Sequence, residues 1–156
     1  MHAPQRPVYD WQFATPGDEA SPVTVAITRE KVRQYAAMLP DGNPAFQPAL
    51  DGTDLRVPIP LVRIYAPLRR RELVAEKGAD YPNHPTPAVR WLCRFLGEPR
   101  VGTHVVSVTR VKNKYVKNER HFLEWEVVAY AEDGEPLLRF GYVNLWDRGK
   151  AEDRNR

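Results

Sequence analysis

The sequence has a single cysteine, Cys93, among its 156 residues. A lone cysteine excludes a disulfide within the chain, which fits a reducing compartment such as the cytosol. We expect its side chain to act as a small buried apolar group rather than as a reactive thiol.

Long apolar runs and a strong charge of either sign are also missing. No stretch approaches the roughly 18 apolar residues that span a bilayer, and residues 1–7 lack the apolar segment of a secretion signal. The net charge of +3, from 23 basic and 20 acidic residues, gives no reason to expect nucleic-acid binding. We therefore expect a soluble, cytoplasmic protein that binds neither membranes nor nucleic acids.

The composition that remains is that of one globular domain. Hydrophobic residues make up 42% of the chain and charged residues 28%, which excludes a disordered or collagen-like protein. We expect residues 1–20 to form an arm lying on the domain, residues 21–148 to form the domain, and residues 149–156 to form a flexible tail.

A first helix is predicted from Thr28, which is a good N-cap residue, to Leu39. Glu30 complements the positive end of the helix dipole, and apolar residues recur at helical spacing. Pro40 should end the helix. Residues 40–60 contain five prolines and two glycines, so we expect a long loop there. Long loops in compact domains are often functional.

A second helix is predicted from Pro60 to Lys77. Proline suits the first turn of a helix, and an apolar face follows it. Pro67 should kink or interrupt this helix, and Gly78 should stop it.

The rest of the chain predicts antiparallel strands, because apolar residues alternate and turn residues separate the runs. Asp133 and Gly134 suggest a type I′ hairpin turn, and another turn is expected near residues 117–119. Helices followed by a run of strands indicate an α+β fold, with the second helix lying across the sheet. The expected strands are 89–95, 105–116, 121–131 and 137–146.

The segment Tyr35-Ala36-Ala37-Met38-Leu39-Pro40-Asp41-Gly42-Asn43-Pro44-Ala45-Phe46 resembles the hydratase motif of the MaoC-like dehydratases. In that family a helix bearing an aromatic residue runs into Gly-Asp-x-Asn-Pro-x-His, whose aspartate and histidine are catalytic. Asp41, Asn43 and Pro44 match this motif, whereas Pro40 replaces the glycine and Phe46 replaces the histidine. Half of the catalytic pair is therefore present.

Three further segments resemble the FAS1-like subgroup of these dehydratases. Residues 28–36 look like its opening helix, residues 57–61 like the start of its central helix, and residues 94–103 like the turn before its long strands. The resemblance spans residues 23–146. It implies a single hotdog domain, in which an antiparallel β-sheet wraps around a central α-helix.

By the same resemblance, hotdog domains pair side by side and form acyl-thioester sites at their interface. The exposed edges of a lone curved sheet are an independent reason to expect pairing. A dimer is thus the smallest expected unit, either of two copies or with a catalytic MaoC-like subunit.

Phe46 matters for catalysis because it replaces the residue that would transfer a proton. Hydration of an enoyl thioester needs a base that activates water, an acid that protonates carbon, and donors at the thioester carbonyl. A phenyl ring transfers no proton. Asp41 stays a candidate catalytic residue, with an exposed turn or capping role as the alternative.

His84 is the second catalytic candidate, because it precedes a predicted strand and could reach the mouth of a tunnel; a solvated loop histidine is the alternative. A basic rim of arginines from the second helix and the following strand would suit the phosphates of coenzyme A, or else form a solvated face. The candidate substrate-binding residues are Asn43, Phe46, Pro60, Leu61, Arg63, Tyr65 and Arg94.

No cofactor is expected, only a coenzyme A or acyl-carrier thioester as substrate. No metal is expected either, because His84, His104 and His121 lack the spacing of a metal site.

Three functions remain open. The leading hypothesis is a non-catalytic or half-site subunit of an enoyl-thioester hydratase or 3-hydroxyacyl-thioester dehydratase, paired with a catalytic hotdog partner. The second is a homodimeric acyl-thioester-binding protein without catalysis. The third is a hotdog thioesterase, for which Asp41 or Glu72 would have to lie beside the thioester.

Overall fold

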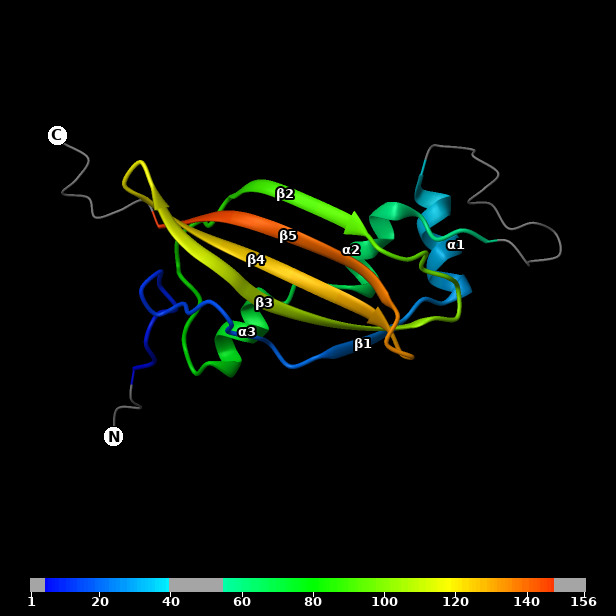
Figure 1. The fold of residues 1–156 in the computed structure, drawn as a ribbon, viewed down its shortest axis with the longest axis horizontal. Helices are drawn as coiled ribbons and strands as arrows, with labels where there is room; N and C mark the ends of the chain where they lie inside the picture. The colour runs from blue at the N-terminus through cyan, green and yellow to red at the C-terminus, as the bar shows by residue number, and fades with distance from the viewer. Residues whose placement is uncertain (1–4, 40–54, 148–156) are drawn as a thin grey trace.

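The computed structural model describes residues 5–39 and 55–147 (Figure 1). In this part of the chain, five antiparallel strands form one sheet in the order β1-β3-β4-β5-β2. The strands are β1 (Val23–Ala26), β2 (Ala88–Phe95), β3 (His104–Lys117), β4 (Arg120–Ala131) and β5 (Pro136–Asp147). The helices are α1 (Arg29–Met38), η2 (Ile59–Leu61), α2 (Val62–Tyr65) and α3 (Arg70–Glu76).

The sheet confirms the predicted antiparallel arrangement and adds β1 to it. Strands β3, β4 and β5 form a meander, while β1 pairs with β3 and β2 pairs with β5. The two outer strands come from before and after the helices, so they close the sheet on either side of the meander. Each has one neighbour among the described strands.

Helix α1 begins as the sequence predicts. The Thr28 hydroxyl accepts a hydrogen bond from the Lys31 backbone N–H at 3.2 Å, and Glu30 lies in the first turn. Val32 is the fully buried residue of this helix. The expected stop at Pro40 lies outside the described residues.

The central helix is interrupted near Pro67, as predicted. Helix α2 ends at Tyr65 and α3 starts at Arg70, because proline has no N–H to continue the helical hydrogen bonds. Gly78 then stops α3 with a positive φ of 71° and donates its N–H to the Ala75 carbonyl at 3.0 Å. Together with a bond from Ala79 N–H to the Val74 carbonyl, this forms a Schellman motif.

Both pieces of the central helix pack against the sheet, which confirms a hotdog fold. Leu61, Val62 and Tyr65 join buried residues of β3, β4 and β5 in one core cluster. Leu73 and Val74 of α3 join a second cluster with Trp125 and other sheet residues. The two pieces of the helix therefore pack into two core clusters, and Leu68 between them packs against both.

Residues 5–20 cover the second cluster. Tyr9 and Ala14 are fully buried there, and the Tyr9 N–H donates to the Asp80 carbonyl at 2.9 Å. Trp11 donates its indole N–H to the Phe122 carbonyl at 3.1 Å. The division of the whole chain into arm, domain and tail stays a prediction.

One turn prediction is wrong. A type I′ turn requires positive φ at both central residues, and at Asp133 and Gly134 only the glycine has it, at 90°. The Ala131 N–H instead donates to the Glu135 carbonyl, which gives a longer loop. The two-residue turn with positive φ at both positions is Asn118 and Glu119, between β3 and β4.

Cys93 is less buried than the sequence predicts, but it packs as an apolar side chain. It is half-buried on β2 and packs against the first core cluster. Burial raises the pKa of its thiol, so the reactive thiolate form is disfavoured.

Candidate functional site

An apolar groove lies where the central helix starts. It has a volume of about 550 Å³ and is lined by Arg56, Val57, Ile59 and residues 95–99. We call it the helix-start groove. The two segments that line it are far apart in sequence, and an isolated antiparallel bridge between Arg56 and Arg100 joins them. They are the segments that resemble the start of the family's central helix and the turn before its long strands.

Three large apolar side chains at this groove are exposed to solvent. Ile59 is 64% exposed, Leu96 43% and Phe95 37%. Among the described lining residues, the charged side chains are Arg56 and Glu98, and there is no histidine. The groove therefore suits an apolar ligand, and this part of it offers little for proton transfer.

The predicted substrate residues of the central helix lie beside the groove, not in its described lining. Pro60 and Arg63 are exposed on η2 and α2. Leu61 and Tyr65 are each 1% exposed in the first core cluster. Their neighbour Ile59, which the sequence did not single out, is the one that faces the groove.

Arg94 lies on β2, opposite Arg139 of β5, and is exposed. Its neighbour Phe95 lines the groove. Asp41, Asn43 and Phe46 lie outside the described residues. Of the seven predicted substrate residues, five lie in the described part, and none of these five lines the groove.

Tyr65 brings a buried hydroxyl to the core beneath this region. Among the described residues its oxygen has no hydrogen-bond partner. Burial, with the Cys93 thiol nearby, raises the pKa of Tyr65, so the phenol stays neutral. A neutral phenol can donate one hydrogen bond but is no base.

His84 lies at the other end of β2. It precedes Ala88, where the strand begins, whereas the groove follows Phe95. The strand has eight residues, and its seven steps of about 3.3 Å each separate the two ends by about 23 Å. The His84 Nε2 atom lies 2.7 Å from the Trp146 carbonyl oxygen, so Nε2–H donates to it and the ring is held in place.

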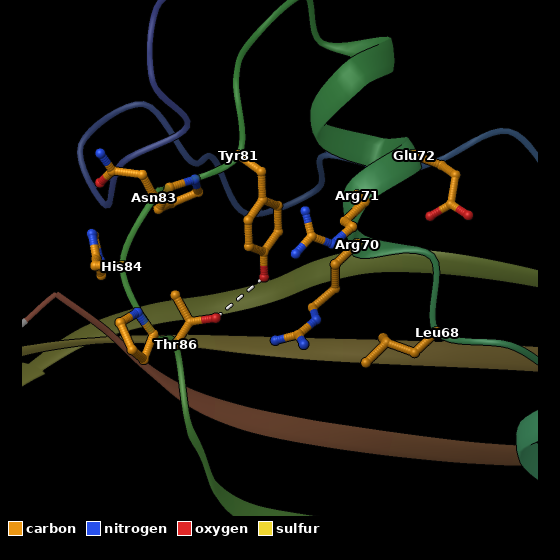
Figure 2. Close-up of a pocket in the computed structure, with 10 residues that line it drawn as sticks. Leu68, Arg70, Arg71, Glu72, Tyr81, Asn83, His84 and Thr86 are labelled. Carbon is orange, nitrogen blue, oxygen red and sulfur yellow. Dashed lines mark hydrogen bonds between the residues drawn. The ribbon is translucent and has the colours of Figure 1, made fainter.

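His84 belongs to a second, more polar pocket of about 720 Å³ (Figure 2). Leu68, residues 70–72 and residues 81–86 line it. We call it the arginine pocket. Of the arginines predicted to form a basic rim, Arg70 and Arg71 meet in this pocket, while the Arg69 guanidinium donates to the Ser21 carbonyl at 2.8 Å.

No metal site emerges in residues 5–39 and 55–147, where no three histidine, cysteine or carboxylate side chains gather. Within the same residues, no helix has the length and hydropathy needed to cross a membrane.

The edge of β2 is the most apolar exposed feature of the sheet. Val89 is 56% exposed, Trp91 51% and Leu92 60%. Because side chains alternate along a strand, Trp91 and Leu92 project from opposite faces. In the described part of the chain, β2 pairs with β5 alone, so no described strand pairs with its outer backbone groups, and an edge of this kind can bind another strand.

The sequence matches no protein-family model and no curated protein. Solved structures do match the fold. A monoamine oxidase regulatory protein from Archaeoglobus fulgius matches with a TM-score of 0.68 and 15% identity, over 93% of this chain and 98% of that one.

Two dehydratases follow. The HadBC 3R-hydroxyacyl-ACP dehydratase complex from Mycobacterium tuberculosis has a TM-score of 0.64 and 16% identity, over 80% of this chain and 90% of that one. A MaoC-like dehydratase from Rhodospirillum rubrum has a TM-score of 0.61 and 15% identity, over 89% and 97%. The chain has the fold of the MaoC-like dehydratases. (R)-hydratases share this hotdog fold.

The sequence predicts only part of the candidate site, which consists of the helix-start groove and the edge of β2. Ile59 and Phe95 line one groove, but they are separated in the chain and each reads as an ordinary apolar residue. A signal for the free edge was present, because Leu92 interrupts the alternation of apolar and polar residues in β2. An apolar residue on each face suits a strand that is covered on both sides.

Proposed function

We propose that this chain is a subunit of an enoyl-thioester hydratase or 3-hydroxyacyl-thioester dehydratase, completed by a second hotdog chain that carries the catalytic pair. One juxtaposition carries the proposal: the helix-start groove opens at the end of β2, the strand with the free apolar edge. A partner strand along β2 would border the groove. An apolar groove at such an interface suits the acyl part of a thioester.

The few acid–base side chains at the groove favour a partner that supplies the catalytic pair. Hydration needs a base and an acid within hydrogen-bond reach of the reacting atoms. The described groove lining contributes Glu98 and Arg56, and Phe46 stands where the MaoC-like motif has its histidine. Asp41 could position water, but the proton-transfer partner of the motif is replaced in this chain.

A partner of the same fold is the natural occupant of the β2 edge. HadBC, which shares the fold, is by its description a complex. Adding a strand to β2 satisfies its free N–H and C=O groups and covers Trp91 and Leu92. In such a pair, the groove residues Ile59 and Phe95 and the motif residues Asn43 and Phe46 would contact substrate from this chain, and Arg94 would lie at the interface.

The test is a reconstitution. The chain is purified alone and together with the product of a neighbouring gene that has the catalytic MaoC-like motif, and the loss of enoyl-thioester absorbance is followed for several acyl chain lengths. Expected is hydration by the mixture only, with the same rate when Asp41→Ala replaces the wild-type chain. The partner with its own aspartate changed to alanine is the matched control and should be inactive.

Other outcomes would assign other functions. Full activity of the isolated chain, abolished by Asp41→Ala, would overturn the partner proposal. Thiol release without hydration would indicate a thioesterase, and binding of acyl-CoA without either reaction would indicate a silent binding protein. Glu72 is a weak thioesterase candidate, because it lies on α3 and its carboxylate is 3.8 Å from the Arg69 guanidinium.

A further inference from the structure

The arginine pocket holds two guanidinium groups without a carboxylate partner. Arg70 and Arg71 both line it, and in residues 5–39 and 55–147 neither forms an ion pair. Glu72, the one carboxylate of the lining, is turned away from both guanidinium groups (Figure 2). It approaches Arg69 instead. The pocket is therefore positively charged.

Arg70 has a buried guanidinium nitrogen that an anionic ligand could pair with. Its Nη1 atom is buried and has no hydrogen-bond partner among the described residues. A buried donor left unpaired is costly, and a charged donor more so. The guanidinium extends below the Tyr81 hydroxyl toward Thr86, into the space between α3 and the loop of residues 81–86 (Figure 2). An anion placed there would accept the free N–H.

Arg71 is held in position on the same side. Its guanidinium carbon lies 4.6 Å from the centre of the Tyr81 ring, a cation–π contact that fixes the side chain without neutralising it. The edge of the guanidinium remains available to donate hydrogen bonds. Together with Arg70, which lines the same pocket, Arg71 makes a site with two guanidinium groups for a planar or tetrahedral anion.

Hydroxyl groups complete the pocket. The Tyr81 hydroxyl and the Thr86 hydroxyl are 3.2 Å apart, and either can be the donor. Whichever donates to the other, the second hydroxyl hydrogen remains free for a ligand. His84 closes one side with its ring anchored on the Trp146 carbonyl.

We propose that the arginine pocket binds the phosphate group of a phosphorylated small molecule, through Arg70 and Arg71. Phosphate offers several acceptor oxygens to the two guanidinium groups and the free hydroxyl, and arginine forks match its geometry. The volume of about 720 Å³ exceeds the needs of one phosphate, so an organic group attached to it has room beside Leu68. The site lies at the other end of β2 from the helix-start groove and does not rest on the hydratase function.

The experiment measures phosphate binding to the full chain by isothermal titration calorimetry. The probes are inorganic phosphate, adenosine 3′,5′-bisphosphate and coenzyme A, with adenosine as the probe without phosphate. The variants are Arg70→Gln, Arg71→Gln and Arg70→Lys. The matched control is Arg33→Gln, which removes the same charge from an exposed position on α1. Thermal melting of each variant checks its folding.

The expected result is binding of the phosphorylated probes but not of adenosine, weakened at least tenfold by Arg70→Gln and by Arg71→Gln. Arg70→Lys should keep part of the affinity because the charge remains but the fork is lost. Tighter binding of the bisphosphate than of phosphate would identify a nucleotide as the source, and equal binding would identify free phosphate. Absence of binding by all phosphorylated probes, or an equal loss with Arg33→Gln, would overturn the proposal.

Discussion

Trp146 donates its indole N–H to the backbone carbonyl of Tyr9, with the nitrogen and oxygen 2.9 Å apart. This bond joins β5 to the N-terminal segment across 137 residues of sequence. Both side chains are buried, Trp146 at 1% exposure and Tyr9 at 0%. Residues 5–20 therefore contribute buried side chains to the second core cluster.

Trp146→Phe should lower the free energy of unfolding by about 2–3 kcal/mol. The change leaves the Tyr9 carbonyl without its donor and opens a cavity in the second core cluster. Urea denaturation followed by circular dichroism measures the loss. Trp91→Phe is the matched control, because Trp91 is 51% exposed, and it should cost less than about 0.5 kcal/mol. Equal costs at the two positions would contradict the packing described.

Acid should weaken the N-terminal segment through Asp18. Burial opposes ionisation of this carboxyl, but hydrogen bonds from Tyr9, Lys77 and the Thr15 N–H outweigh it and lower the pKa of Asp18 below its usual 3.8. The stabilisation is thus present at neutral pH and is lost as the pH falls through the lowered pKa. The Tyr9 hydroxyl is the closest donor, at 2.6 Å.

Tyr9→Phe should therefore cost about 1–2 kcal/mol at neutral pH, and the difference from the wild type should shrink as the carboxyl is protonated. Melting temperatures recorded between about pH 7 and pH 2 test this. Tyr115→Phe is the control, because that ring stacks on Phe122 and its effect should not vary with pH. A Tyr9→Phe cost that is constant over this pH range would argue against the Asp18 contact.

The features of the fold that the sequence predicts correctly depend on residues close to one another in the chain. Thr28 caps α1 and Gly78 ends α3 because each acts on backbone groups within one turn of itself. Pairing is different. β1 adds to β3, and Glu126 is buried at 7% exposure beside Arg110, 16 residues away. No local pattern in the sequence predicts which strand will pair with β1 or which charged side chain will pair with Glu126.

The site was less predictable for the same reason. The resemblance pointed to the segments around Pro60 and Arg94, and both segments do border the groove. Ile59 and Phe95 line the groove, and each is the chain neighbour of a predicted residue, whose own part in substrate binding stays a prediction. On β2, a shift of one residue turns a side chain to the other face of the strand, so resemblance between segments does not show which side chains line a groove.

Leu92→Glu should disrupt association through the β2 edge. Burying a leucine at an interface contributes about 1.5–3 kcal/mol, and a carboxylate there also costs desolvation, so the dissociation constant should rise more than tenfold. Sedimentation velocity over a concentration series, with and without the partner chain, measures this. Val116→Glu is the control, since Val116 is 52% exposed on the β3 to β4 hairpin. A wild-type chain that stays monomeric with and without the partner would contradict the use of this edge.

Phe46→His should give the isolated chain a measurable hydratase activity. The substitution restores the residue that can exchange protons in the MaoC-like motif, and general acid–base catalysis typically contributes about 10²–10⁴-fold. The gain should exceed tenfold over the wild type, disappear when Asp41→Ala is added, and rise with pH through about 6.5 as the imidazole becomes neutral. Phe46→Asn is the matched control, because an amide is polar but transfers no proton at neutral pH. If the histidine and asparagine variants are both folded and equally inactive, a histidine at position 46 does not restore catalysis. The catalytic groups must then all come from the partner.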